Sequence, residues 1–181
     1  MLRQNTEIYV IMGFDTGDYP YAHRKEHIFL EKRETMVCCF FGHSHTPDSV
    51  RPLLKEQVEK LLSEYEDIHF YMGNHGNFDA MARRTMKELK TQYPHLSYNV
   101  VLAYLPGKKY EFEAEDAYAD TLYPDGLEFV PRRFAISARN KWMVEQSDMV
   151  ICYKIADGGG AAQFIRMAER KGKAIINLAN M

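Results

Sequence analysis

Short apolar runs alternate with longer segments of helical period along most of this chain. The runs have the length and continuity of strands buried on both faces, and they occupy residues 36–41, 68–72, 98–104, 149–153 and 174–178. Between them, apolar side chains recur every three or four residues, which predicts amphipathic helices, over residues 50–65, 78–90, 132–147 and 161–171. Strands joined by helices form a parallel sheet through right-handed crossovers. The pattern predicts a Rossmann-like α/β fold, an open, doubly wound sheet of about five mainly parallel strands with helices on both faces.

Two segments depart from this alternation. Residues 1–35 contain two short apolar runs separated by a turn, so we expect an N-terminal extension that forms a hairpin or has no fixed structure. Residues 105–131 are punctuated by proline and glycine and are rich in tyrosine and acids. Because a connection of that length is usually functional, we expect a lid or binding segment there. The domain itself is predicted to span residues 36–181.

Net charge, the positions of the cysteines and the length of the apolar runs limit the classes of protein to which this chain can belong. The formal net charge is −2 and the pI is near 6.4, which is not the electrostatic footprint of a protein that binds duplex DNA or an anionic membrane. Cys38, Cys39 and Cys152 all lie in apolar runs, as is typical of buried thiols in a reducing compartment. No apolar run reaches the roughly 18 residues that a membrane-spanning helix needs. We therefore expect a cytoplasmic protein that does not bind a membrane.

The loops after three of the predicted strands carry the candidate chemistry. In a doubly wound sheet, ligands lie outside the carboxyl ends of the strands, where the strand order reverses. The first and fourth predicted strands should be neighbours there, with the second strand beside the first. The three loops begin at Gly42, Gly73 and Ala156, and each contains glycine with polar residues.

The third loop has the strongest signal for an anion. Gly158, Gly159 and Gly160 open a predicted helix, and a glycine turn there leaves backbone N–H groups and the positive end of the helix dipole for a phosphate. Arg139 could add a guanidinium to the same anion, and Asp79 could accept hydrogen bonds from ribose hydroxyls. The alternatives are a plain turn, a surface ion pair of Arg139, and a helix cap at Asp79.

Four motifs occur in order over residues 36–178. They are Gly42-His43 after the first strand, the loop from Gly73 to Phe78-Asp79 after the second, the pair Arg139-Asn140, and Ser147-Asp148 followed by Gly159-Gly160-Ala161. Together they resemble the SLOG superfamily, and most closely its short bacterial branch. The resemblance implies a Rossmann-like domain that assembles into dimers or larger homo-oligomers. The superfamily includes cytokinin-activating phosphoribohydrolases, a DNA-processing protein that loads single strands, and sensor domains for nucleotide-derived signals.

This chain departs from the family pattern at three positions. Ser44 stands where the family usually has arginine, and His45 where an acidic residue often follows. Ile165 stands where the phosphoribohydrolase branch has its catalytic glutamate. Because hydrolysis of an N-glycosidic bond would need another carboxylate, such as Asp79 or Glu145, the resemblance favours binding over catalysis.

Histidines and aromatic residues leave two further alternatives. His43, His45 and His75 could supply the three protein ligands of an open zinc site, although we expect no metal and no cofactor. Tyr118, Tyr123 and Phe129 could stack a base, or they could fill the core at the end of the sheet.

The sequence therefore predicts a protein that binds a nucleotide or nucleotide-derived small molecule, as a sensor or by sequestration. Two alternatives stay open, namely a nucleoside-phosphate hydrolase of phosphoribohydrolase type and a single-stranded nucleic-acid binding protein. The net charge and the acidic loop make nucleic acid the less expected partner. The predicted ligand-binding residues are Gly42, His43, Ser44, Gly73, Asn74, Gly76, Asp79, Arg139, Asn140, Gly158, Gly159 and Gly160.

Overall fold

The computed structural model describes residues 35–105, 120–155 and 158–181. The chain divides into two units, Met1–Glu31 and Lys32–Met181, and all the described residues belong to the second. The predicted N-terminal extension therefore lies outside the described residues, apart from Thr35. So does Tyr118, which the sequence offered as a stacking residue.

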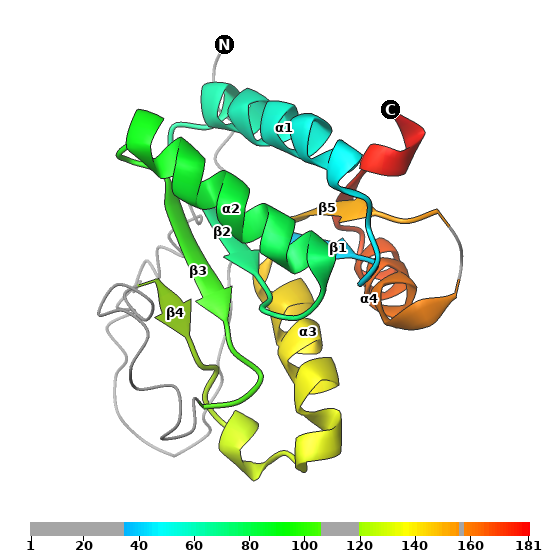
Figure 1. Ribbon diagram of the computed structural model, residues 1–181. Coiled ribbons are helices and arrows are strands. Elements are labelled where there is room, and N and C mark those ends of the chain that lie inside the picture. Colours follow the sequence, from blue (N-terminus) through cyan, green and yellow to red (C-terminus); the bar gives the residue numbers. More distant parts are fainter. Residues whose placement is uncertain (1–34, 106–119, 156–157) are drawn as a thin grey trace, which may run out of the picture. The chain divides into compact units, whose positions relative to one another are not determined.

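Six parallel strands form one sheet in the order β4-β3-β2-β1-β5-β6 (Figure 1). Their bounds are β1 Met36–Gly42, β2 Ile68–Met72, β3 Ser97–Val101, β4 Thr121–Leu122, β5 Met149–Tyr153 and β6 Ala174–Asn177. The predicted fold class is confirmed. The first strand neighbours the fourth predicted strand, now β5, with Cys39 opposite Val150. The short β4 was not predicted, because two residues within an irregular segment carry no readable period.

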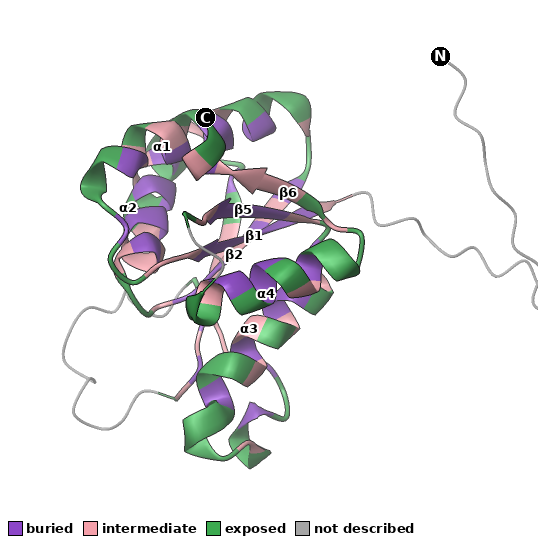
Figure 2. Ribbon diagram, turned by 90° about the vertical axis from the view of Figure 1, so that its right-hand side faces the viewer, coloured by how far each residue is buried: buried purple, intermediate pink, exposed green. Residues whose placement is uncertain are grey.

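Helices cover both faces of the sheet (Figure 2). Helices α1 (Arg51–Glu64) and α2 (Asn77–Gln92) pack on one face, and α3 (Ala135–Gln146) and α4 (Gly159–Arg170) pack on the other. Stacked ring pairs mark the two cores, with centroids 5.8 Å apart for Phe40 and Phe70 and also for Phe41 and Phe164. Neighbouring residues of β1 thus point into opposite cores, as the pleat of a strand requires.

Short 3-10 helices complete the described connections. They are η1 Asp48–Val50, η3 Leu127–Phe129, η4 Arg132–Phe134 and η5 Leu178–Asn180. The segment that was predicted as the start of the third helix is thus η4, and α3 itself begins only at Ala135. Helix α4 begins at Gly159, so two of the three glycines form its first turn.

The three cysteines are free and buried in the sheet. Burial raises the pKa of Cys39 and of Cys152 to about 12, and it also raises the pKa of Cys38 well above its ordinary value. Their thiols therefore stay protonated and unreactive at neutral pH. Among the helices of the described residues, none is long and apolar enough to cross a membrane.

Candidate functional site

The loops after β1, β2 and β5 meet at the C-terminal edge of the sheet. The backbone N–H of Asn77 donates to the carbonyl of Ser44 over 3.0 Å. Gly76 has φ +90°, and a side-chain carbon there would come within 3.0 Å of the Ser44 α carbon, so this close approach requires glycine. On the other side of the first loop, a Cβ at Gly159 would lie 3.9 Å from Nδ1 of His43.

A largely buried centre with two opposite charges, which we call the buried centre, lies between these loops and α3. A Cβ added to Gly73 would overlap both the carboxylate of Asp79 and the guanidinium of Arg139, so both groups lie against the Gly73 α carbon. Nη1 of Arg139 donates to the carbonyl of Val101 over 2.8 Å, and Oδ2 of Asp79 accepts from the backbone N–H of His75 over 3.0 Å. The centre thus links α3 to the end of β3 and to the loop after β2.

Burial dominates the electrostatics of this centre. It raises the pKa of Asp79, while the charge of Arg139 and the His75 N–H act in the opposite direction. Burial likewise lowers the pKa of Arg139, opposed by the charge of Asp79. Each group therefore loses hydration, and the opposite charge of the other group compensates part of that loss.

The surface ion pair considered as the alternative for Arg139 is wrong. Arg139 is only 1% exposed, and its Nε has no hydrogen-bond partner among the described residues. It belongs to the buried stripe of α3, together with Ala135 and Met143 one turn before and one turn after it. That spacing was readable from the sequence, and it indicates a side chain directed at the sheet rather than at solvent.

The predicted ligand-binding residues fall into two groups. Gly73, Asp79 and Arg139 form the buried centre, whereas Gly158, Gly159 and Gly160 are exposed at the start of α4 with His43 beside them. Ser44 is exposed, Gly42 and Asn140 are partly buried, and a Cβ at Gly42 would overlap the ring of Phe78. The phosphate role of the three glycines and the ribose role of Asp79 stay predictions.

Three buried polar atoms at this edge lack a partner among the described residues. They are Nε2 of His43, Oδ1 of Asn74 and Nε of Arg139. The N-cap residue Gly158 provides no side-chain hydrogen bond to the first turn of α4, so within the described part of the chain the first N–H groups of this helix have no side-chain cap. Such groups can hydrogen-bond a polar ligand.

An aromatic and cationic cluster borders the buried centre, and sequence reasoning missed it. The Arg132 guanidinium lies 5.0 Å from the ring centroid of Tyr104, whose hydroxyl donates to the Arg132 carbonyl over 3.2 Å. The His75 ring meets Tyr104 edge-on at 5.9 Å. Tyr104 was predicted to end the third strand. That strand ends at Val101, and the next residues turn toward η4.

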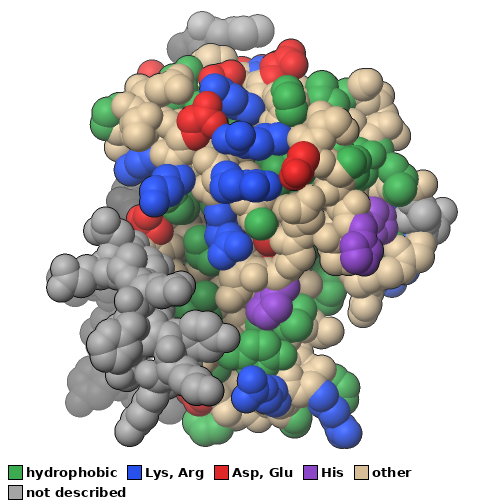
Figure 3. Space-filling model, in the orientation of Figure 1, with side chains coloured by type: hydrophobic (Ala, Val, Ile, Leu, Met, Phe, Trp, Pro, Cys, Tyr) green, Lys and Arg blue, Asp and Glu red, His purple; other side chains and the backbone are tan. Residues whose placement is uncertain are grey.

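Basic side chains gather on the face formed by α1 and α2 (Figure 3). We call Arg83, Arg84, Lys87 and Lys90 of α2 the basic stripe. Arg83 lies close enough to the sheet edge for its charge to lower the pKa of both His75 and Asp79. The stripe therefore begins at the buried centre and runs along α2.

The structure also places several residues on which the remaining alternatives from the sequence depend. Among residues 35–105, 120–155 and 158–181, no three His, Cys, Asp or Glu side chains are grouped to hold a metal. Ile165 is buried in the core, and Glu145 lies on the surface 3.9 Å from Lys141. Phe129 is 84% exposed, so it does not fill the core.

Comparison with known proteins gives one informative similarity. No family model matches the chain. Large ribosomal subunit protein uL13 of Chlorobium luteolum is 32% identical to it over 90 residues, which are 45% of this chain and 56% of that protein. The chain thus spans about half the length of the curated relative that it matches.

This similarity corrects the predicted ligand. A component of the large ribosomal subunit is unlike a sensor or sequestering protein for a nucleotide-derived small molecule. The prediction of a sensor or sequestering role is therefore wrong. The expectation that nucleic acid is an unlikely partner is wrong for the same reason. The physical reason is that a helix N-terminus recognises a phosphate in the same way whether it belongs to a free nucleotide or to a polynucleotide.

Proposed function

We propose that this domain binds single-stranded RNA, with the phosphate backbone lying along the basic stripe of α2 and across the C-terminal edge of the sheet. The observation that carries the proposal is the continuity between the stripe and the sheet edge. The similarity to a ribosomal protein supports it. We also propose that the chain is related to the SLOG superfamily, which includes a protein that loads single DNA strands. That relationship would agree with binding of a single strand.

The spacing of the stripe suits a polyanion. Arg83, Lys87 and Lys90 recur at intervals of four and three residues, so they stand one above another on the helix. At a rise of 1.5 Å per residue, their α carbons are therefore about 6.0 and 4.5 Å apart along the helix axis. A flexible single strand can place consecutive phosphates against such a row.

The acidic residues near the stripe do not prevent phosphate binding. Asp48 pairs with Arg84 at 3.3 Å, and both side chains are more than half exposed. Glu88 pairs with Arg51 and Lys55 of α1, again at the surface. Exposed pairs of this kind contribute little to stability, so phosphates can replace the carboxylates at small cost. The local arrangement of charge, rather than the net charge of −2, governs binding.

The start of α4 offers a second contact for the same strand. Its uncapped N–H groups and helix dipole favour a phosphate, and they lie at the sheet edge that the stripe reaches. A strand that follows α2 to the sheet edge would meet them after passing His75. In this arrangement, the turn of Gly158, Gly159 and Gly160 would bind a phosphate of the RNA strand rather than of a free nucleotide.

Fluorescence anisotropy with a labelled single-stranded 12-mer RNA tests the proposal. The double variant Arg83→Gln/Lys87→Gln should weaken binding about tenfold and make the dependence of log K on log salt shallower by about 1.4, since two phosphate contacts are lost. The matched control is Arg170→Gln/Lys171→Gln, which removes two exposed charges at the end of α4, on the other face of the sheet. It should bind like the wild type. Absence of salt-dependent binding by the wild type, or equal weakening in both variants, would refute the proposal.

A further inference from the structure

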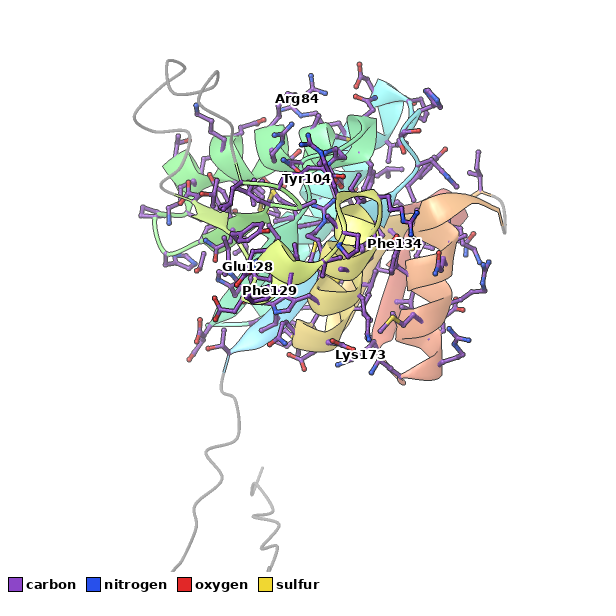
Figure 4. The ribbon with its side chains drawn as sticks, turned by 90° about the horizontal axis from the view of Figure 1, so that it is seen from below. Arg84, Tyr104, Glu128, Phe129, Phe134 and Lys173 are labelled. Atoms are coloured by element: carbon purple, nitrogen blue, oxygen red, sulfur yellow. The ribbon has the colours of Figure 1, made fainter. Side chains whose placement is uncertain are left out.

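A hollow lies beside the Tyr104 cluster, between the end of β3 and the 3-10 helices η3 and η4. It has a volume of about 300 Å³ and is a wide depression, largely open to solvent. Its walls include Tyr104, Tyr123, Glu128 and Arg132, and its floor includes Leu127 and Ala135. Figure 4 looks onto this side of the molecule and labels Tyr104 and Glu128.

The floor is apolar and the rim is charged. Leu127 and Ala135 are buried, whereas Glu128 and Arg132 are exposed. The Tyr104 ring is held in place, because its hydroxyl is bound to the Arg132 carbonyl and the Arg132 guanidinium lies over its face. An immobilised ring above an apolar floor is the arrangement that stacks a flat heterocycle.

The size of the hollow limits what it can hold. A volume of about 300 Å³ is at the lower end of the range for ligand sites, so it suits one planar base and not a larger ligand. It borders the sheet edge that the RNA strand would cross, because Tyr104 contacts His75 there. Sequence-specific recognition of RNA commonly places an unpaired base against an aromatic side chain.

Glu128 selects among the bases. An ionised carboxylate only accepts hydrogen bonds, and its two oxygens can accept from two adjacent donors. Guanine presents such a pair on its Watson–Crick edge, N1–H and the N2 amino group. Arg132, which lines the same hollow as Glu128, offsets the repulsion between that carboxylate and the RNA backbone.

We infer that this hollow binds one unpaired guanine of the RNA strand, stacked on Tyr104 with its Watson–Crick edge at Glu128. The inference rests on the proposed function and names the base that the strand must contain. It adds a specificity site to a surface whose other contacts recognise only phosphate.

Inosine tests the inference directly, because it differs from guanosine only in lacking the N2 amino group. The probes are two labelled 12-mer oligouridines with one central guanosine or one central inosine. We expect the wild type to bind the guanosine probe about tenfold more tightly, the lower-middle range for a bidentate base contact. Glu128→Gln should abolish most of this preference, since an amide cannot accept from both donors. Tyr104→Ala should weaken binding of both probes.

The matched control is Phe129→Ala, because Phe129 is an exposed aromatic residue next to Glu128 that does not line the hollow. It should keep the preference for guanosine. Thermal unfolding of every variant checks that the fold is retained. Equal affinity of the wild type for the two probes, or a preference that survives Glu128→Gln, overturns the inference. Either result refutes only the base site if RNA binding stays salt-dependent and sensitive to Arg83→Gln/Lys87→Gln. If the wild type binds no RNA, the proposed function fails as well.

Discussion

The carboxylate of Asp79 and the guanidinium of Arg139 lie against the α carbon of one glycine, Gly73. One group comes from the first turn of α2 and the other from the middle of α3, on opposite faces of the sheet. They meet beyond the end of β2, where no strand separates the two layers. The attraction between these two charges thus links both helical layers at the edge where the candidate site lies.

Gly73→Ala should destabilise the fold. The new methyl group would overlap both charged groups, and Arg139, which is buried and bound to the Val101 carbonyl, would have to move. Overpacking of this kind typically costs about 1–3 kcal/mol. Urea unfolding followed by circular dichroism measures the loss. Gly158→Ala is the control, because its φ is −94° and a Cβ there meets nothing within 4 Å; it should change stability by less than about 0.5 kcal/mol.

Removing one of these two opposite charges should cost more stability than removing both. Arg139→Met leaves the Asp79 carboxylate enclosed beside the unpaired Val101 carbonyl, and loss of one partner of a buried pair typically costs about 3–5 kcal/mol. Asp79→Asn leaves Arg139 without its counter-charge. The double variant should be more stable than the sum of the single effects predicts, with a coupling of about 0.5–3 kcal/mol. A double-mutant cycle measured by urea unfolding gives this number, and strict additivity would show that the two side chains are independent.

The pH dependence of stability reports on Asp79 separately. Burial raises its pKa in the folded state above the ordinary unfolded value of about 3.9, so the folded protein holds this proton more tightly. The corresponding stabilisation is present at low pH and is lost as the pH rises through the folded pKa. Relative to Asp79→Asn, the wild type should therefore lose unfolding free energy as the pH rises from about 4 toward neutrality. Urea unfolding of both proteins across this range tests the sign, and a difference that is constant or increases with pH would contradict it.

The layers of the fold were predictable because buried strands have a recognisable sequence pattern. A continuous apolar run such as Val37–Phe41 can be only a strand buried on both faces or part of a buried helix, and Gly42 directly after it favours the strand. The adjacency of β1 and β5 followed from the fold class alone. Both predictions depend on local periodicity and on general topology, which a single sequence contains.

The candidate site was only half predictable. Glycines after strands located the three loops, because close backbone contacts such as that between Gly76 and Ser44 require the smallest residue. The Tyr104–Arg132 cluster and the hollow were missed because residues 120–134 have no period that places their side chains. A surface ion pair stayed open as an alternative for Arg139 because its charge was given weight beside its position on the buried stripe of α3.

Lowering the pH should strengthen RNA binding through His75. This side chain is exposed at the sheet edge but has lost part of its hydration to the surrounding protein. That loss is the largest cause that lowers its pKa, and the charges of Arg139 and Arg83 lower it as well. Asp79 and Tyr104 are the other titratable groups close to it. A phosphate bound beside Arg83 would offset those positive charges, so RNA should bind the protonated form of His75 more tightly and raise its pKa.

Anisotropy at pH 7.5 and pH 5.5 with the guanosine-containing 12-mer measures this linkage, since uracil and guanine do not change protonation between these values. The wild type should bind more tightly at pH 5.5 and gain about 0.7 in the magnitude of its salt slope, equivalent to one added phosphate contact. His75→Gln cannot be protonated and should show neither change. If the variant keeps the full pH dependence, the phosphate path does not pass His75, and the RNA strand must leave α2 before it reaches the edge of the sheet.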